Sequence, residues 1–125
     1  MKFLLVDDSK TMRNIWKKVI ANIDGSEVVE AGDGLEGLEA FKNNQPFDMM
    51  LVDWNMPNMN GLEMIGKIRE QDKTTPIIMV TTEAEKPRII EAIKAGVNDY
   101  VVKPFTPDAL LEKINATREK AAASA

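Results

Sequence analysis

The sequence predicts an α/β protein in which five βα units wind around a central parallel sheet. Short apolar runs alternate with segments of helical period, and this alternation occurs five times along 125 residues. The first run, Phe3–Val6, is continuously apolar, as expected for a strand that is buried on both faces. With 44% hydrophobic and 29% charged residues, the chain has the size and composition of one globular domain.

The first unit pairs a strand expected at Phe3–Val6 with a helix capped by Ser9. Its expected buried stripe has members three and four residues apart: Met12, Ile15, Trp16, Val19, Ile20 and Ile23. Residues 24–25 (Asp-Gly) end this helix, and residues 27–31 predict the second strand.

The next two helices begin with the spacing of a capping box. In the first of them Asp33 replaces the usual Ser or Thr, and in the second Asn60 does so. Between them, residues 47–52 predict the third strand, with Asp53 at its carboxyl end. The expected buried positions are Leu35, Leu38 and Phe41 in the first of these helices and Leu62, Ile65 and Ile68 in the second.

The last two units follow the same pattern. Strands are expected at residues 77–80 and 100–102, and Pro87 stands where the first turn of a helix tolerates proline. Thr106 is expected to cap the last helix, and the alanine-rich residues 120–125 to form a frayed tail. The expected buried positions are Ile89, Ile90 and Ile93 in the fourth helix and Leu110, Leu111 and Ile114 in the fifth.

Composition excludes several classes of function. The chain has no cysteine and no histidine, which rules out disulfides, thiolate nucleophiles, imidazole bases and zinc sites of the usual kind. A net charge of −4 disfavours nucleic-acid binding. No apolar run approaches the roughly 20 residues that cross a bilayer, so we expect a cytoplasmic protein with no membrane partner.

Chemically active side chains follow four of the five expected strands. Asp7 and Asp8 follow the first, Asp53 the third, Thr81 the fourth and Lys103 the fifth. In doubly wound sheets, ligands bind at the carboxyl ends of strands where the strand order reverses. If the order is 2-1-3-4-5, that point lies between the first and third strands, and the three carboxylates meet there.

Three converging carboxylates repel one another unless a cation lies among them. Mg²⁺ fits such a cluster because it prefers oxygen ligands, and a backbone carbonyl near Asn55 would add one more. Separately, Asp7 and Asp8 could only favour a helix N-terminus, and Asp53 could be a solvated acid. Their joint occurrence at strand ends favours a metal and phosphate site.

The neighbouring polar groups suit phosphoryl transfer. The Thr81 hydroxyl and the Lys103 ammonium could hold the oxygens of a phosphoryl group while Asp53 acts as the nucleophile and forms an acyl phosphate. Taken singly, Thr81 is an ordinary strand residue and Lys103 an ordinary surface charge. For Tyr100 and Trp54, aromatic packing is the competing interpretation.

Four ordered segments resemble the motifs of response-regulator receiver domains, most closely those of stand-alone chemotaxis regulators. The segments are Asp7-Asp8, residues 53–61, residues 81–83 and residues 100–105. The resemblance covers nearly the whole chain, which makes it far more specific than any one motif. It implies a single receiver domain over residues 1–125, with a flavodoxin-like sheet in the order 2-1-3-4-5 and helices on both faces.

The resemblance also implies a role for each residue. Asp53 would accept a phosphoryl group from a sensor histidine kinase. Asp8, Asp53 and the Asn55 carbonyl would bind Mg²⁺, with Asp7 acting through water. Thr81 would be the switch hydroxyl.

At the neighbouring positions, Lys103 would bind the phosphate, and the rotamer of Tyr100 would report phosphorylation. Asn55 and Glu83 lie two positions after Asp53 and Thr81, within reach of an attacking water, so we expect them to tune dephosphorylation. The alternative for both is a solvated loop residue.

The expected output is a changed surface over the fourth helix, fifth strand and fifth helix. For chemotaxis-type receivers the partner is the flagellar motor switch, a phosphatase is a further candidate partner, and a monomer is the default. A phosphorelay intermediate stays open. The alternative from another class is an aspartyl phosphatase of the haloacid-dehalogenase type, although Asn55 stands where that class has a second acid.

Overall fold

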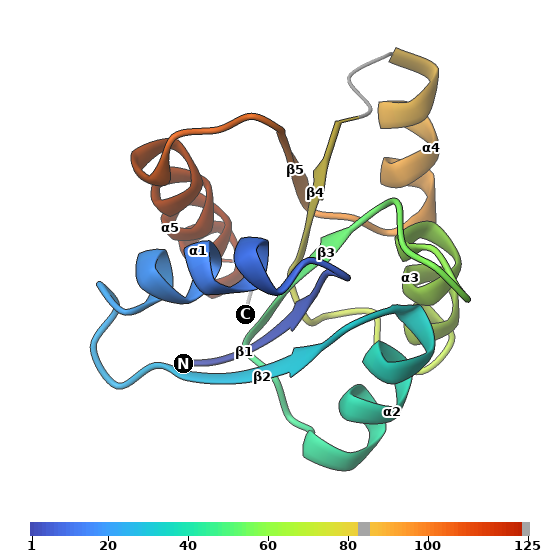
Figure 1. Ribbon diagram of the computed structural model, residues 1–125, viewed down its shortest axis with the longest axis horizontal. Coiled ribbons are helices and arrows are strands. Elements are labelled where there is room, and N and C mark those ends of the chain that lie inside the picture. Colours follow the sequence, from blue (N-terminus) through green and yellow to red (C-terminus); the bar gives the residue numbers. More distant parts are fainter. Residues whose placement is uncertain (83–85, 124–125) are drawn as a thin grey trace.

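The computed structural model describes residues 1–82 and 86–123. Its five strands form one parallel sheet in the order β2-β1-β3-β4-β5, as expected (Figure 1). The elements in chain order are β1 (Lys2–Val6), α1 (Lys10–Ile20), β2 (Glu27–Ala31), α2 (Gly34–Asn44), β3 (Met49–Asp53), α3 (Gly61–Arg69), β4 (Ile77–Thr81), α4 (Lys86–Ala95), β5 (Asp99–Val102) and α5 (Pro107–Ala123).

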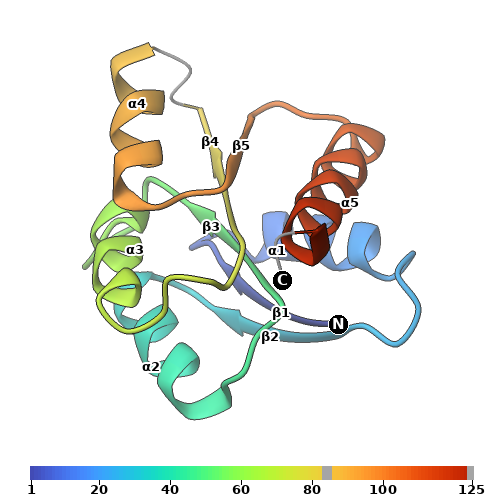
Figure 2. The ribbon, with the colours of Figure 1, turned by 180° about the vertical axis from the view of Figure 1, so that it is seen from behind.

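Helices cover both faces of the sheet. Helices α1 and α5 lie on one face, and α2, α3 and α4 lie on the other (Figures 1 and 2). Successive side chains of each strand point to opposite faces of the sheet and so contribute to both cores. In β1, Phe3 and Leu5 pack under α1 and α5, whereas Leu4 and Val6 pack under the other three helices. Burial on both faces explains why the three inner strands, β1, β3 and β4, have continuous apolar runs, whereas the edge strand β2 carries the exposed Glu27 and Glu30.

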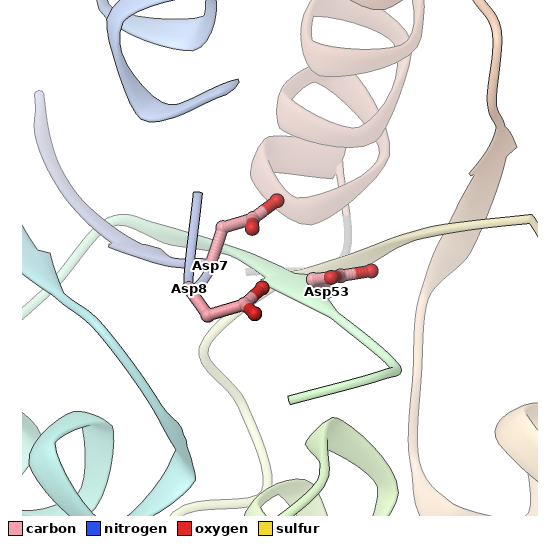
Figure 3. A group of neighbouring side chains, drawn as sticks. All are labelled: Asp7, Asp8 and Asp53. Carbon is pink, nitrogen blue, oxygen red and sulfur yellow. The ribbon is translucent and has the colours of Figure 1, made fainter. Parts of the chain in front are cut away.

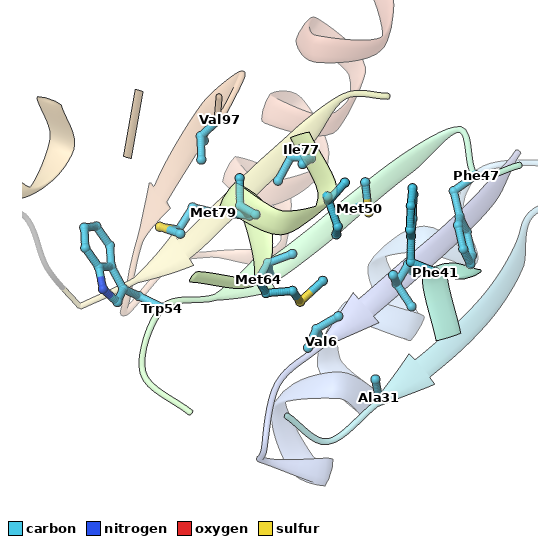
Figure 4. Close-up of a cluster of buried hydrophobic side chains, with 14 of the residues drawn as sticks. Val6, Ala31, Phe41, Phe47, Met50, Trp54, Met64, Ile77, Met79 and Val97 are labelled. Carbon is cyan, nitrogen blue, oxygen red and sulfur yellow. The ribbon is translucent and has the colours of Figure 1, made fainter. Parts of the chain in front are cut away.

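The larger core lies between the sheet and helices α2–α4. Phe41 and Phe47 stack at one end of it with ring centroids 6.4 Å apart, and Trp54 lies at the other end (Figure 4). Methionines from the strands and from α3 fill the space between them. The smaller core, on the opposite face, includes the fully buried Trp16 of α1.

All four predicted helix caps are present. Ser9, Asp33, Asn60 and Thr106 each accept a hydrogen bond from the backbone N–H three residues along the chain, at 3.2, 2.8, 2.9 and 3.1 Å respectively. These caps fix where α1, α2, α3 and α5 begin, directly after the loops that leave the carboxyl edge of the sheet.

The predicted buried face of α2 is wrong in one position. Leu35 is 51% exposed, whereas the predicted Phe41 is buried, together with Gly34 and Gly37. The reason is close packing: a β-carbon on Gly37 would lie 2.7 Å from the Met64 sulfur. The helix therefore approaches its neighbour along a strip of glycines, and this rotates Leu35 into solvent.

Two further helices bury fewer residues than their periodicity predicts. Ile15 of α1 is 37% exposed, and Ile90 and Ile93 of α4 are 43% and 56% exposed. Among the described residues of α4 only Ala92 is buried. Helix α4 packs beside α3 at the end of its layer (Figure 2), so a narrow strip of its surface is covered and the rest of the apolar stripe faces outward.

Element boundaries differ modestly from expectation. Asp53 is the last residue of β3, and β5 begins one residue earlier than predicted. Helix α5 continues to Ala123, into the segment for which composition predicts fraying. Within residues 1–82 and 86–123, no helix combines the length and apolar character needed to cross a membrane.

Candidate functional site

Three carboxylates meet where β1 and β3 end. The register pairs Val6 with Val52, so the residues that follow them, Asp7 and Asp53, are neighbours. Asp7 and Asp8, which follow β1, and Asp53 each place a carboxylate oxygen within 4.8 Å of the other two, and Figure 3 shows the three side chains close together. Asp7 is 1% exposed and Asp53 6%, whereas Asp8 faces solvent. The predicted convergence is confirmed.

Lys103 brings a positive charge to this cluster from β5. Its Nζ lies 3.3 Å from Asp7 Oδ2 and 3.4 Å from Asp53 Oδ1. The backbone N–H of Lys103 donates to the carbonyl of Thr81 at 2.7 Å, which places the lysine directly after the paired ends of β4 and β5. One ammonium thus bridges two buried carboxylates, and the site retains excess negative charge.

Burial and mutual repulsion perturb the titration of this cluster. The pKa of Asp53 is raised to about 6 because burial and, after it, the charge of Asp7 outweigh the opposing effect of Lys103. Burial also raises the pKa of Asp7, against the hydrogen bond from the Ser9 backbone and the charge of Lys103. Keeping both carboxylates ionised at this buried site therefore costs free energy, and an additional cation would lower that cost.

The donor set suits a hard divalent cation. The cluster offers oxygen ligands, two of them on buried residues and one on an exposed residue, so the site is supported by the fold and open on one side. Asn55, whose backbone carbonyl is the further expected ligand, lies in the exposed loop two residues after Asp53. The geometry is compatible with Mg²⁺ and its retained waters.

An arginine that sequence analysis missed supports the turn after β1. The Arg13 guanidinium donates to the backbone carbonyl of Asp7 through Nη1 and to Glu30 Oε1 through Nε at 3.0 Å. Lys17 also pairs with Glu30, at 3.1 Å, and the backbone N–H of Ser9 donates to Asp7 Oδ1 at 2.8 Å. The position of Arg13 near the start of α1 is a signal for such a role, because a cation in the first turn of a helix is electrostatically unfavourable unless it has a specific partner.

The two expected switch residues lie on neighbouring strands. Thr81 is 2% exposed at the end of β4, and its register partner is Val102 of β5. Tyr100, on β5, is half-buried, and the Lys113 ammonium lies 5.8 Å from its ring centroid. Glu83, the second residue expected to tune dephosphorylation, lies outside the described residues.

Trp54 belongs to the core rather than to the open site. It is 4% exposed, and the Arg88 guanidinium of α4 lies 5.5 Å from its ring centroid. This contact is a cation–π pair that ties α4 to the residue next to Asp53. The packing interpretation of Trp54 is therefore confirmed.

The model of the response regulator receiver domain family matches residues 3–115. The chain belongs to the response regulator receiver domain family. The motif-based resemblance is confirmed.

This receiver is similar to proteins named for chemotaxis. It is 49% identical over 116 residues to a "Chemotaxis protein CheY homolog" of Campylobacter jejuni, covering 91% of this chain and 89% of the relative. It is 48% identical over 116 residues to "Chemotaxis protein CheY1" of Helicobacter pylori, covering 91% and 94% of the two chains.

Solved structures agree with the fold. A CheY-like receiver domain protein from Methanospirillum hungatei superposes with a TM-score of 0.90 at 30% identity, covering 99% of this chain and 98% of the other. The chemotaxis regulator CheY4 of Vibrio cholerae gives a TM-score of 0.85 at 36% identity, covering 93% and 97%. The predicted flavodoxin-like architecture is confirmed.

Proposed function

We propose that this receiver is a phosphorylation-activated chemotaxis response regulator. Asp53 accepts a phosphoryl group from a sensor histidine kinase, and the phosphorylated form binds the flagellar motor switch. The observation that supports this most strongly is the meeting of three carboxylates and Lys103 at the ends of β1, β3 and β5. Similarity to proteins named CheY supports the chemotaxis assignment.

In this proposal Asp53 is the nucleophile. A carboxylate oxygen attacks phosphorus, the bond from phosphorus to the donor's leaving atom breaks, and an acyl phosphate forms. A pKa of about 6 keeps the carboxyl group mostly ionised at neutral pH while making it more basic than an ordinary aspartate. Lys103, already 3.4 Å from Asp53 Oδ1, is placed to compensate charge on the transferred group.

The residues that would hold Mg²⁺ are Asp7, Asp8, Asp53 and, through its backbone carbonyl, Asn55. When bound, Mg²⁺ supplies positive charge that neutralises the phosphoryl oxygens. Asp53 would provide a buried ligand oxygen, the buried Asp7 would act through water, and the exposed Asp8 would complete the set from the solvent side. Asn55 and Glu83, on the loops after β3 and β4, tune the slow loss of the phosphoryl group.

In this proposal, phosphorylation of Asp53 changes the surface formed by α4, β5 and α5, and Thr81 transmits the change. A phosphoryl group on Asp53 offers strong acceptor oxygens, so the Thr81 hydroxyl moves toward it. Tyr100, one strand over, then turns inward and changes the face next to α4. Ile90 and Ile93 of α4 are exposed and would supply apolar contacts to a partner there. The proposal places these encounters in the cytoplasm, with the receiver acting as a monomer.

Labelling with acetyl phosphate tests the proposed function. In the presence of Mg²⁺ we expect at most one phosphoryl group per chain, in the parent but not in Asp53→Asn. Hydrolysis of p-nitrophenyl phosphate should show no sustained turnover. Continuous turnover would instead support the aspartyl-phosphatase alternative, and a label that persists in Asp53→Asn would exclude Asp53 as the acceptor.

A further inference from the structure

The loop between β3 and α3, residues 54–60, is tied to the N-terminus of α2. Asn58 Nδ2 donates to Asp33 Oδ2 at 2.7 Å, and the backbone N–H of Gly34 donates to the carbonyl of Met59 at 3.1 Å. This loop begins immediately after Asp53 and contains Asn55. The start of α2 therefore contacts the segment whose backbone carbonyl is an expected metal ligand.

Asp33 uses its two carboxylate oxygens for different partners. Oδ1 accepts from the Glu36 backbone N–H at 2.8 Å and caps α2, while Oδ2 accepts from Asn58. The residue is 7% exposed. The hydrogen bond from the Glu36 backbone, followed by that from Asn58, holds the pKa of Asp33 below its ordinary value. A cap alone needs one oxygen, so the second is available to hold the loop.

The backbone contacts around this link leave little free space. A β-carbon on Gly34 would lie 2.4 Å from the Met59 carbonyl oxygen, so only glycine permits this approach. Asn58 has a φ of 66°, a left-handed conformation that asparagine tolerates better than most residues. At the end of the loop, the Gly61 N–H donates to the Trp54 carbonyl at 2.8 Å. The loop is thus held at its closure and, through Asn58 and Met59, against α2.

We propose that Asp33 and Asn58 are positioning residues for the metal site. Their hydrogen bond holds the loop so that the Asn55 carbonyl is ready to bind Mg²⁺. Neither residue belongs to the carboxylate cluster, and the proposed role rests on the proposed function of that cluster. Without the link, ordering of an exposed loop would have to accompany metal binding, and its entropic cost would weaken the affinity.

The test compares two variants that remove the same charge. Asp33→Ser keeps an oxygen that can cap α2 but has none left for Asn58. Asp33→Asn keeps a capping oxygen and an amide that can bond to Asn58 once that side chain turns over. Asn58→Gly removes the donor without changing charge and tolerates the positive φ. Mg²⁺ affinity is measured by titration calorimetry on the full chain, after circular dichroism has confirmed that each variant is folded.

We expect the Mg²⁺ dissociation constant to rise about tenfold in Asp33→Ser and in Asn58→Gly, and to stay within about threefold of the parent in Asp33→Asn. Parent-like affinity in folded Asp33→Ser and Asn58→Gly would overturn the inference. Equal weakening in both Asp33 variants would also overturn it, because charge would then be the cause. If the parent itself binds no Mg²⁺, the proposed function fails, and the inference fails with it.

Discussion

At Asp53, burial and the negative charge of Asp7 raise the pKa while a neighbouring ammonium lowers it. The pKa reaches about 6 because burial and Asp7 together outweigh Lys103. The ionised Asp53 and Asp7 therefore destabilise the metal-free fold at neutral pH. The same burial and charge repulsion favour binding of a cation. Such a cost is common at functional sites, where local stability is lost to keep reactive groups together.

The free energy of unfolding of the metal-free protein should depend on pH, because ionising the buried Asp53 destabilises the folded state. The folded pKa of Asp53, about 6, exceeds the ordinary value of 3.8, so the folded state holds the proton more tightly. This group therefore contributes most stability below about pH 4, and the contribution is lost as the pH rises through the folded pKa. Asp53→Asn should be more stable than the parent above that pKa, by on the order of 2 kcal/mol after allowing for solvent screening, and the difference should vanish below about pH 4.

Urea denaturation in the presence of a chelator, from acid to neutral pH, measures this difference. Asp24→Asn, at an exposed acid outside the cluster, controls for the loss of one carboxylate. A difference between Asp53→Asn and the parent that does not change with pH would contradict the assigned cause.

Asp8 is the exposed member of the cluster, so its removal should affect metal binding more than folding. We expect Asp8→Ala to weaken Mg²⁺ binding at least tenfold, because both an anionic ligand and its geometry are lost. Loss of one negative charge should leave the metal-free variant as stable as the parent or more so. Calorimetric titration with Mg²⁺ checks the affinity, and a parent-like curve would show that the proposed ligand set is wrong.

At the scale of elements, close approach of backbones decides how helices lie on the sheet. Helix α3 begins where a β-carbon on Gly61 would lie 2.1 Å from the Asp53 carbonyl oxygen. The same helix contains Gly66, where a β-carbon would meet nothing within 4 Å. The two glycines provide a matched pair within one helix, one at a tight contact and one in open space.

We expect Gly61→Ala to lower the free energy of unfolding by about 1–3 kcal/mol, because backbone must move to admit the methyl group. Gly66→Ala should raise it by about 0.5–1 kcal/mol through better helix propensity. Denaturant unfolding of the two variants and the parent measures both effects. Equal changes in the two variants would mean that the close contact at Gly61 has no energetic consequence.

The limits of sequence-based prediction also lie at this scale. Continuous apolar runs and capping residues are local signals, so strands and helix starts could be predicted well. The buried side of a helix also depends on its neighbours, so Leu35, Ile90 and Ile93 lie at the surface although helical periodicity predicts them to be buried. Similarly, the strand-end carboxylates were predictable from topology, whereas the contacts of Arg13 and the link from Asp33 to Asn58 join loops that no local pattern connects.

Across the whole molecule, the site and the proposed partner surface are joined by two adjacent strands. Thr81 ends β4 beside the cluster, and Tyr100 lies on β5, whose backbone is paired with β4. Trp54, next to Asp53, contacts Arg88 of α4 and provides a second connection to that helix. The proposed switch needs two arrangements that differ by only a few kcal/mol, of which phosphorylation favours one.

The most direct test of this account is an NMR comparison of the parent and Thr81→Ala, each with Mg²⁺ and with or without beryllofluoride, which mimics a phosphoryl group on Asp53. In the parent we expect backbone amide shifts at the cluster and also along α4 and β5. In Thr81→Ala we expect the shifts at the cluster to remain and those along α4 and β5 to shrink to a small fraction. Undiminished shifts along α4 and β5 in Thr81→Ala would contradict the claim that this hydroxyl couples Asp53 to the partner surface.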